Sequence, residues 1–141
     1  MLYREKRSRS ILVAASSAYR VFLLGLLSVL QDQLESEQFE AVLEETGRRL
    51  ARESGLPITA DFQTSLTRAM AAANSLGAST EAIPDGDATL VRNYSCPVAG
   101  AVRKTPCMCK ALAAFFSEAT SRPASEQCLR EGRLLCQYRI G

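Results

Sequence analysis

The sequence contains no histidine and no tryptophan, and only nine of its residues are Phe or Tyr. Without histidine, Ser-His-Asp and Cys-His catalysis are excluded, and a metal ion could be bound only by Cys, Asp or Glu. The scarcity of aromatic rings argues against a stacking surface for single-stranded nucleic acid. We therefore expect a binding domain rather than an enzyme.

The sequence also has no large excess of charge of one sign, because it contains 17 basic and 15 acidic residues and its net charge is +2. A basic cluster does occur at the start, at Arg4, Lys6, Arg7 and Arg9. A balanced chain of this kind is not expected to bind nucleic acid by electrostatics alone. Gly and Pro are not enriched, and 47% of the 141 residues are hydrophobic, which is typical of one globular domain.

The residue pattern predicts an α+β fold, in which N-terminal helices pack on a small antiparallel sheet with inserted short helices and a C-terminal hairpin. Asp61 is expected to cap one helix and Gly77 to end it, and Pro84-Asp85-Gly86-Asp87 is expected to form a turn. The expected helices span 10–34 with Ser10 as N-cap, 38–53, 62–76, 96–104 and 109–121, and the expected strands span 88–95, 125–130 and 133–140. Each element is expected to turn apolar residues toward the core: Phe39, Val42, Leu43 and Leu50 from 38–53; Phe62, Leu66, Ala69, Met70, Ala73 and Leu76 from 62–76; Leu112, Phe115 and Phe116 from 109–121; and Leu134, Cys136, Tyr138 and Ile140 from 133–140.

The segment 11–30 is largely apolar and follows the basic start, so a signal peptide or a membrane anchor is one interpretation. Arg20 in its middle, with Ser16 and Ser17 nearby, favours instead a helix that is buried in the chain's own core or in a homodimer interface. We expect a cytoplasmic single sensor domain over 1–141 with no membrane association. Residues 1–34 would form a linker and dimerisation helix, and residues 35–141 the cysteine-containing core.

Five cysteines are an odd number, and four of them lie in the last 35 residues, which favours a site over a framework of disulfides. Cys128 and Cys136 flank an expected hairpin at Glu131-Gly132. A loop of three or five residues would pair them directly, with Cβ atoms about 5 Å apart, close enough to share a metal. A two-residue loop would place the thiols on opposite faces. A cross-strand disulfide is the other interpretation of this pair.

Cys96 follows an expected strand and Cys109 begins an expected helix, whose free N–H groups favour a thiolate. Lys110 would add to this effect. We predict a site formed by Cys96, Cys109, Cys128 and Cys136, with Cys107 as a substitute ligand. A thiol redox switch that uses Cys107 and Cys109 is a further interpretation of the same residues.

The chain contains a motif that consists of Asn-Tyr-Ser-Cys-Pro at 93–97, Pro106 followed by Cys109, and Cys128 with the ending Cys136-Gln-Tyr-Arg-Ile. It resembles the C-terminal effector domain of iron–sulfur-responsive, ArsR/DeoR-like winged-helix transcriptional repressors. Weaker similarity occurs at 47–51 and 76–77. The resemblance covers most of 35–140.

The resemblance implies that Cys96, Cys109, Cys128 and Cys136 bind an iron–sulfur cluster in a sensor domain that regulates transcription. DNA would then be bound only through a separate winged-helix domain, so the chain is expected to be a fragment, a truncated homologue or a stand-alone effector. The related vinyl-4-reductase-like sensor domains share the Cys-x7-Cys hairpin. They imply the alternative of a structural zinc ion beneath a pocket for a small hydrophobic ligand.

Overall fold

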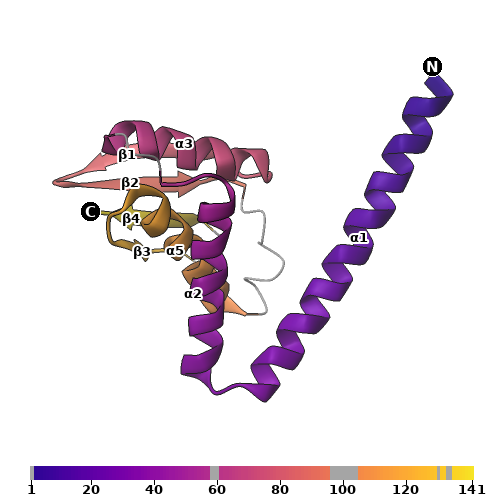
Figure 1. Cartoon of the computed structure of the whole chain (residues 1–141), viewed down its shortest axis with the longest axis horizontal. Coiled ribbons are helices and arrows are strands. Elements are labelled where there is room, and N and C mark those ends of the chain that lie inside the picture. The colour runs from indigo at the N-terminus through magenta and orange to yellow at the C-terminus, as the bar shows by residue number, and fades with distance from the viewer. Residues whose placement is uncertain (1, 58–60, 96–104, 130, 133–134) are drawn as a thin grey trace. The chain divides into compact units, whose positions relative to one another are not determined.

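The computed structural model describes the backbone of residues 2–57, 61–95, 105–129, 131–132 and 135–141, and side chains within these ranges except those of residues 2–17 and 106. The fold is α+β, as predicted (Figure 1). The elements are α1 (Leu2–Gln33), α2 (Ser36–Glu53), α3 (Phe62–Ser75), β1 (Thr80–Asp85), β2 (Ala88–Asn93), the 3-10 helix η1 (Pro106–Met108), α5 (Cys109–Thr120), β3 (Ala124–Glu126) and β4 (Cys136–Ile140). The expected helix over 96–104 lies outside the described residues.

The chain divides into two compact units, Met1–Phe39 and Glu40–Gly141. The first consists mainly of α1, which begins at Leu2 rather than at the predicted cap Ser10, because the residues before Ser10 are good helix formers without a breaker. Tyr19, Val21 and Phe22 of this helix are each more than 70% exposed. In the part of the chain that the structure describes, no helix combines the length and the apolar character that crossing a bilayer requires.

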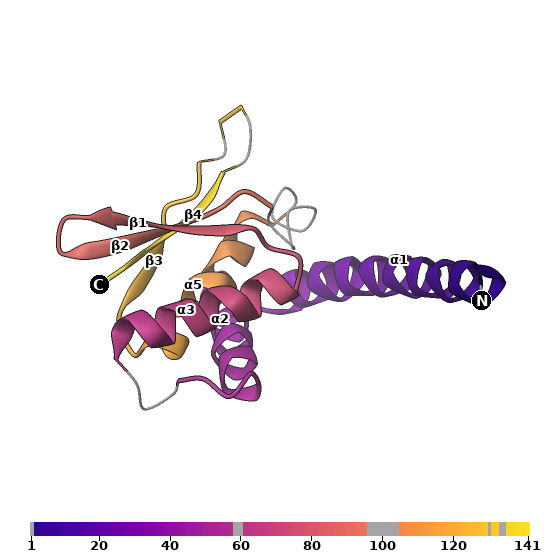
Figure 2. The same cartoon turned by 90° about the horizontal axis from the view of Figure 1, so that it is seen from above.

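The second unit is built around a four-stranded antiparallel sheet with the order β1-β2-β4-β3. Helices α3 and α5 lie on one side of this sheet (Figure 2). Strand β4 alternates between buried and half-buried residues, so Cys136, Tyr138 and Ile140 share the buried face, as predicted. Leu134, the fourth residue expected on this face, lies outside the described residues.

Helix α3 has the predicted ends. The carboxylate of Asp61 accepts a hydrogen bond from the backbone N–H of Thr64 at 2.9 Å. At the other end Gly77 has φ +102, and the N–H of Ala78 donates to the carbonyl of Ala73, which closes a Schellman motif. Within the predicted apolar stripe, Leu66, Ala69 and Ala73 are buried and Phe62 and Met70 partly so, whereas Leu76 is 59% exposed, against the prediction.

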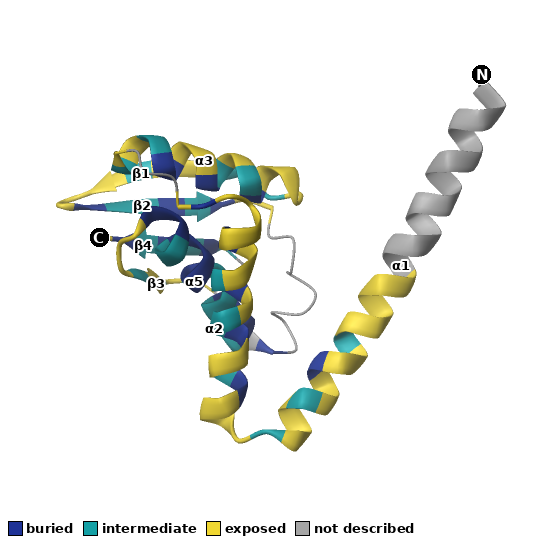
Figure 3. Ribbon diagram, in the orientation of Figure 1, coloured by how far each residue is buried: buried dark blue, intermediate teal, exposed yellow. Residues whose placement is uncertain are grey.

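Helix α5 forms the centre of the core, where buried residues concentrate along its length (Figure 3). Phe115 and Phe116 are buried, as predicted, and the ring of Phe116 lies 5.4 Å from that of Tyr138 on β4. Helix α2 crosses α5 at Gly47, where a Cβ atom would lie 1.8 Å from the carbonyl oxygen of Ala111. The two helices therefore approach each other closely enough to fix the position of α5.

Candidate metal site

The C-terminal hairpin has the odd loop that a shared metal requires. Leu129 and Leu135 form a bridge with two backbone hydrogen bonds of 2.8 and 2.9 Å, so five residues, 130–134, separate the paired positions. The register of β3 and β4 continues unchanged to this bridge. It places Cys128 directly opposite Cys136 at a non-hydrogen-bonded pair, where side chains on antiparallel strands approach most closely. Both residues are present as thiols rather than as a disulfide.

Cys109 is the first residue of α5, as predicted, and its side chain is buried. The chain reaches it through η1, in which the N–H of Met108 donates to the carbonyl of Thr105 at 3.0 Å. The first N–H groups of a helix have no intrahelical acceptor, and their partial positive charge stabilises a thiolate. The fold thus places a buried thiol at an electropositive helix end, facing the hairpin.

Cys109, Cys128 and Glu126 form a group that could hold a metal ion, because one ligand atom from each lies within 4.8 Å of the other two. Glu126 also accepts a hydrogen bond from the backbone N–H of Cys128 at 2.9 Å, which fixes one of its carboxylate oxygens beside the thiol. The motif did not predict Glu126. Its position two residues before Cys128 was the available signal, because residues i and i+2 of a strand share a face.

The thiol of Cys128 contacts both other cysteines of the core. Interaction with the thiol of Cys109 is the main cause that raises the pKa of Cys128, and burial raises it further, whereas a hydrogen bond with Cys136 acts in the opposite direction. The Cys128 thiol also donates to the backbone carbonyl of Gln137 at 3.8 Å. Cys128 therefore contacts two of the other predicted ligands, but the group that could hold a metal contains Glu126 in place of Cys136. A metal ion would have to displace the proton of Cys128.

Cys96, the fourth predicted ligand, lies outside the described residues. Asn93, near it in the sequence, pairs with Cys136 across β2 and β4. The buried amide oxygen of Asn93 accepts hydrogen bonds from the N–H groups of Ser79 and Ser95, at 3.0 and 3.1 Å, which fixes the chain up to Ser95. Cys107, the predicted substitute, lies half-buried in η1 and does not belong to the group of Cys109, Glu126 and Cys128.

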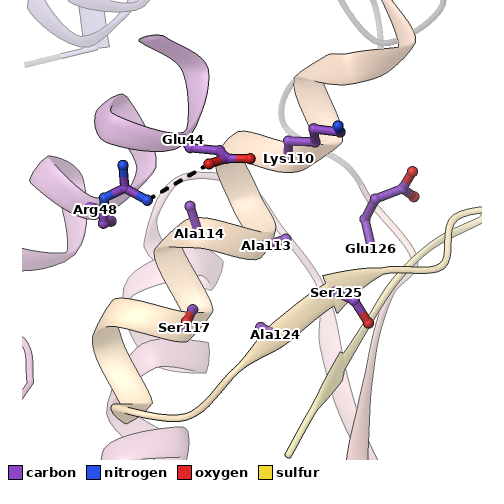
Figure 4. A pocket seen from close by; sticks show the side chains of 9 residues that line it. All are labelled: Glu44, Arg48, Lys110, Ala113, Ala114, Ser117, Ala124, Ser125 and Glu126. Atoms are coloured by element: carbon purple, nitrogen blue, oxygen red, sulfur yellow. Dashed lines mark ion pairs between the residues drawn. The ribbon is translucent and has the colours of Figure 1, made fainter. Parts of the chain in front are cut away.

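A pocket of about 490 Å³ adjoins the group at Glu126. It is lined by α2, α5 and β3, with Glu44 and Arg48 on one side and Ser125 and Glu126 on the other (Figure 4). Lys110, the residue after Cys109, also lines it and forms an ion pair of 2.6 Å with Glu40. Solvent therefore has access to the carboxylate side of the group.

The apolar space between the helices and the sheet is small. A cavity of about 30 Å³ lies there, lined by residues that include Leu112, Phe116 and Tyr138. Small-molecule pockets usually measure about 300–1,000 Å³, whereas this cavity is the size of roughly one water molecule. Among the described residues, this cavity is therefore too small for the hydrophobic ligand of the zinc alternative.

The chemistry of the donors indicates which metals fit. Thiolate ligands select zinc, copper(I) or iron–sulfur clusters, whereas magnesium and calcium require oxygen ligands alone. No protein-family model matches this chain, and no match is found among curated proteins. The group is therefore supported by its geometry as a candidate site for a thiophilic metal.

Proposed function

We propose that this chain is the metal-binding effector domain of a transcriptional regulator, that its cofactor is an iron–sulfur cluster, and that it is not an enzyme. The observation that carries the proposal is the convergence of Cys109, Cys128 and Glu126 within 4.8 Å. The resemblance of the cysteine motif to iron–sulfur-responsive repressors supports the choice of cluster. The ligands that we propose for the cluster are the four cysteines of the motif, Cys96, Cys109, Cys128 and Cys136.

The proposed ligands lie on secondary-structure elements that could transmit a conformational change. Cys109 begins α5, and the next residue, Lys110, binds Glu40 at the start of the second unit. Cys128 belongs to the hairpin, beyond the end of β3. A bound cluster would supply a covalent link between helix and hairpin, and its loss would remove that link. Cluster gain and loss would thus be the signal.

The output is proposed to pass through dimerisation and a separate DNA-binding domain. The exposed apolar side chains of α1 support a homodimer, because a helix of this kind usually covers such a surface with a partner. DNA would be bound by a separate winged-helix domain. The cytoplasm suits such a regulator, because its reducing conditions keep cysteines as thiols.

Anaerobic reconstitution with iron and sulfide tests the proposal. We expect a coloured protein with absorbance at about 400 nm and bound iron by elemental analysis. C109S and C128S should lose most of the bound iron, because each removes a thiolate of the group. C107S is the matched control: it changes a neighbouring half-buried cysteine outside the group and should keep its iron. A colourless wild-type protein without iron would contradict the proposal of a cluster.

Zinc is the alternative cofactor, since the same donors suit a structural zinc site. The alternative predicts about one zinc per chain in the protein as purified, loss of that zinc in C109S and C128S, and no visible colour. The cavity of about 30 Å³ does not favour the hydrophobic ligand of that alternative. Elemental analysis of anaerobically purified protein distinguishes the two metals in one measurement.

A further inference from the structure

We propose that Glu126 is the exchangeable ligand of the metal site and that the adjoining pocket is the route by which a thiophilic metal ion enters and leaves. The inference rests on the proposed function, because it requires a metal at the cysteines. It adds a carboxylate ligand that the cysteine motif does not contain. It also assigns a role to the space between α2, α5 and β3.

The metal-binding group has a buried side and a solvent-accessible side, and Glu126 lies on the accessible one. Cys109 is buried on one side, at the start of α5, and has no exposed surface. Glu126 on the other side is only half-buried and lines the pocket of about 490 Å³. A metal ion bound by this group would therefore meet solvent beside the carboxylate and not beside the Cys109 thiolate.

The chemistry of the ligands, like the geometry, favours Glu126 as the ligand that releases the metal. A carboxylate binds zinc or iron less strongly than thiolates do, because these metals prefer soft sulfur ligands. The weaker ligand thus lies where an incoming chelator or carrier has access. The hydrogen bond from the N–H of Cys128 to Glu126, at 2.9 Å, would keep the carboxylate in place when it releases the metal.

The charges of the pocket do not oppose the entry of a cation. Its lining contains two cationic and two anionic side chains. Both cations are in ion pairs with carboxylates of α2: Lys110 lies 2.6 Å from Glu40, and Arg48 lies 3.1 Å from Glu45. A divalent ion therefore meets no excess of positive charge before it reaches Glu126.

Zinc affinity tests the ligand role, with zinc titrated into the reduced full chain against a chromophoric chelator. E126Q keeps the shape of the side chain but removes its charge, and we expect a loss of affinity of tenfold or more and faster release. E44Q is the matched control, because it removes a carboxylate from the opposite side of the same pocket. Its affinity should stay within about twofold of wild type.

Zinc exchange kinetics test the entry route. In S117F a bulky ring occupies the pocket from α5, and we expect binding and release to slow together by about fivefold or more, with unchanged affinity. T46F places the same ring on an exposed face of α2, away from this pocket, and should change neither rate. S125F offers a second obstruction from β3 if S117F does not fold.

The outcomes separate the inference from the proposed function. Wild-type affinity in E126Q would overturn the ligand role, and unchanged rates in folded S117F or S125F would overturn the entry route. Zinc binding by wild type that is lost in C109S would support the proposed metal site in either case. A wild-type chain that binds neither zinc nor a cluster would contradict the proposed function and the inference together.

Discussion

Replacing Gly47 with alanine tests whether the close crossing of α2 and α5 determines the stability of the core. The added Cβ would lie 1.8 Å from the carbonyl oxygen of Ala111 and 2.8 Å from its carbonyl carbon. Ordinary contact begins at 3.4 Å, so the shorter of these distances is about 1.6 Å too small. The obstacle is the backbone of Ala111 in the first turn of α5, which cannot rotate away as a side chain could. The helices must therefore separate.

The expected cost can be estimated from two opposing effects. Alanine in place of glycine favours a helix by about 1 kcal/mol. Overpacking a close contact costs about 1–3 kcal/mol and occasionally more, and the size of this overlap places G47A at or above the upper end. We therefore expect a net destabilisation of about 2 kcal/mol, which would lower the melting temperature by roughly 10 °C for a unit of this size.

Urea denaturation followed by circular dichroism measures this difference. G25A is the matched control, because Gly25 also lies in a helix but a Cβ there would have no other atom within 4 Å. G25A should be neutral or slightly stabilising. Zinc affinity in G47A should also fall, because α5 carries Cys109 at its first residue. A G47A protein as stable as wild type would refute the reasoning about the helix crossing.

D61N should make the free energy of unfolding less dependent on pH. The hydrogen bond from the N–H of Thr64 lowers the pKa of Asp61 below its ordinary value of 3.8. The stabilisation from Asp61 is therefore complete above pH 3.8 and is lost as the pH falls through the lower pKa of the folded state. Melting curves from about pH 6 to 2 measure this, and equal slopes would contradict it. F22E should convert a dimer to monomers in sedimentation equilibrium, because Phe22 is 75% exposed on α1, and an unchanged mass would exclude this interface. Zinc should slow amide hydrogen exchange at Leu129 and Leu135, whose bridge lies next to Cys128, and equal rates with and without zinc would argue against a metal on the hairpin.

The features that the sequence predicted correctly are those that local chemistry decides. Asp61 and Gly77 occupy the predicted ends of α3, because a carboxylate cap and a left-handed glycine act within a few residues. The pairing of Cys128 with Cys136 follows from the loop length alone, since side chains alternate with a period of two. Cys109 begins α5 because Pro106 starts the turn that precedes it.

The sequence did not predict β1. Its residues are Thr-Glu-Ala-Ile-Pro-Asp, of which four are exposed, so no apolar alternation marks it as a strand. Proline and acidic residues are typical of an edge strand, and its pairing with β2 supplies the structure that its own residues do not favour. Val42 and Leu50 of α2 are similarly about 40% exposed, because periodicity defines an apolar face but not how much of it the core covers.

Glu126 shows why the sequence alone predicted only part of the candidate metal site. A cysteine stands out in a sequence because it is rare and reactive, whereas one glutamate among many acidic residues does not. Glu126 and Cys128 share a strand face by local rules, but their approach to Cys109 depends on how α5 packs against the hairpin, and that packing is tertiary.

The same packing determines what kind of metal site the residues could make. Four thiolates around a single zinc ion would form a closed structural site. A carboxylate at the edge of a solvent-accessible pocket leaves one side of the site open to exchange, while Cys109 remains buried on the other. A sensor requires that combination, because its metal must bind tightly enough to change the protein and yet leave without unfolding it. Under the proposed function, Glu126 is therefore the residue whose substitution tests whether the site can exchange its metal.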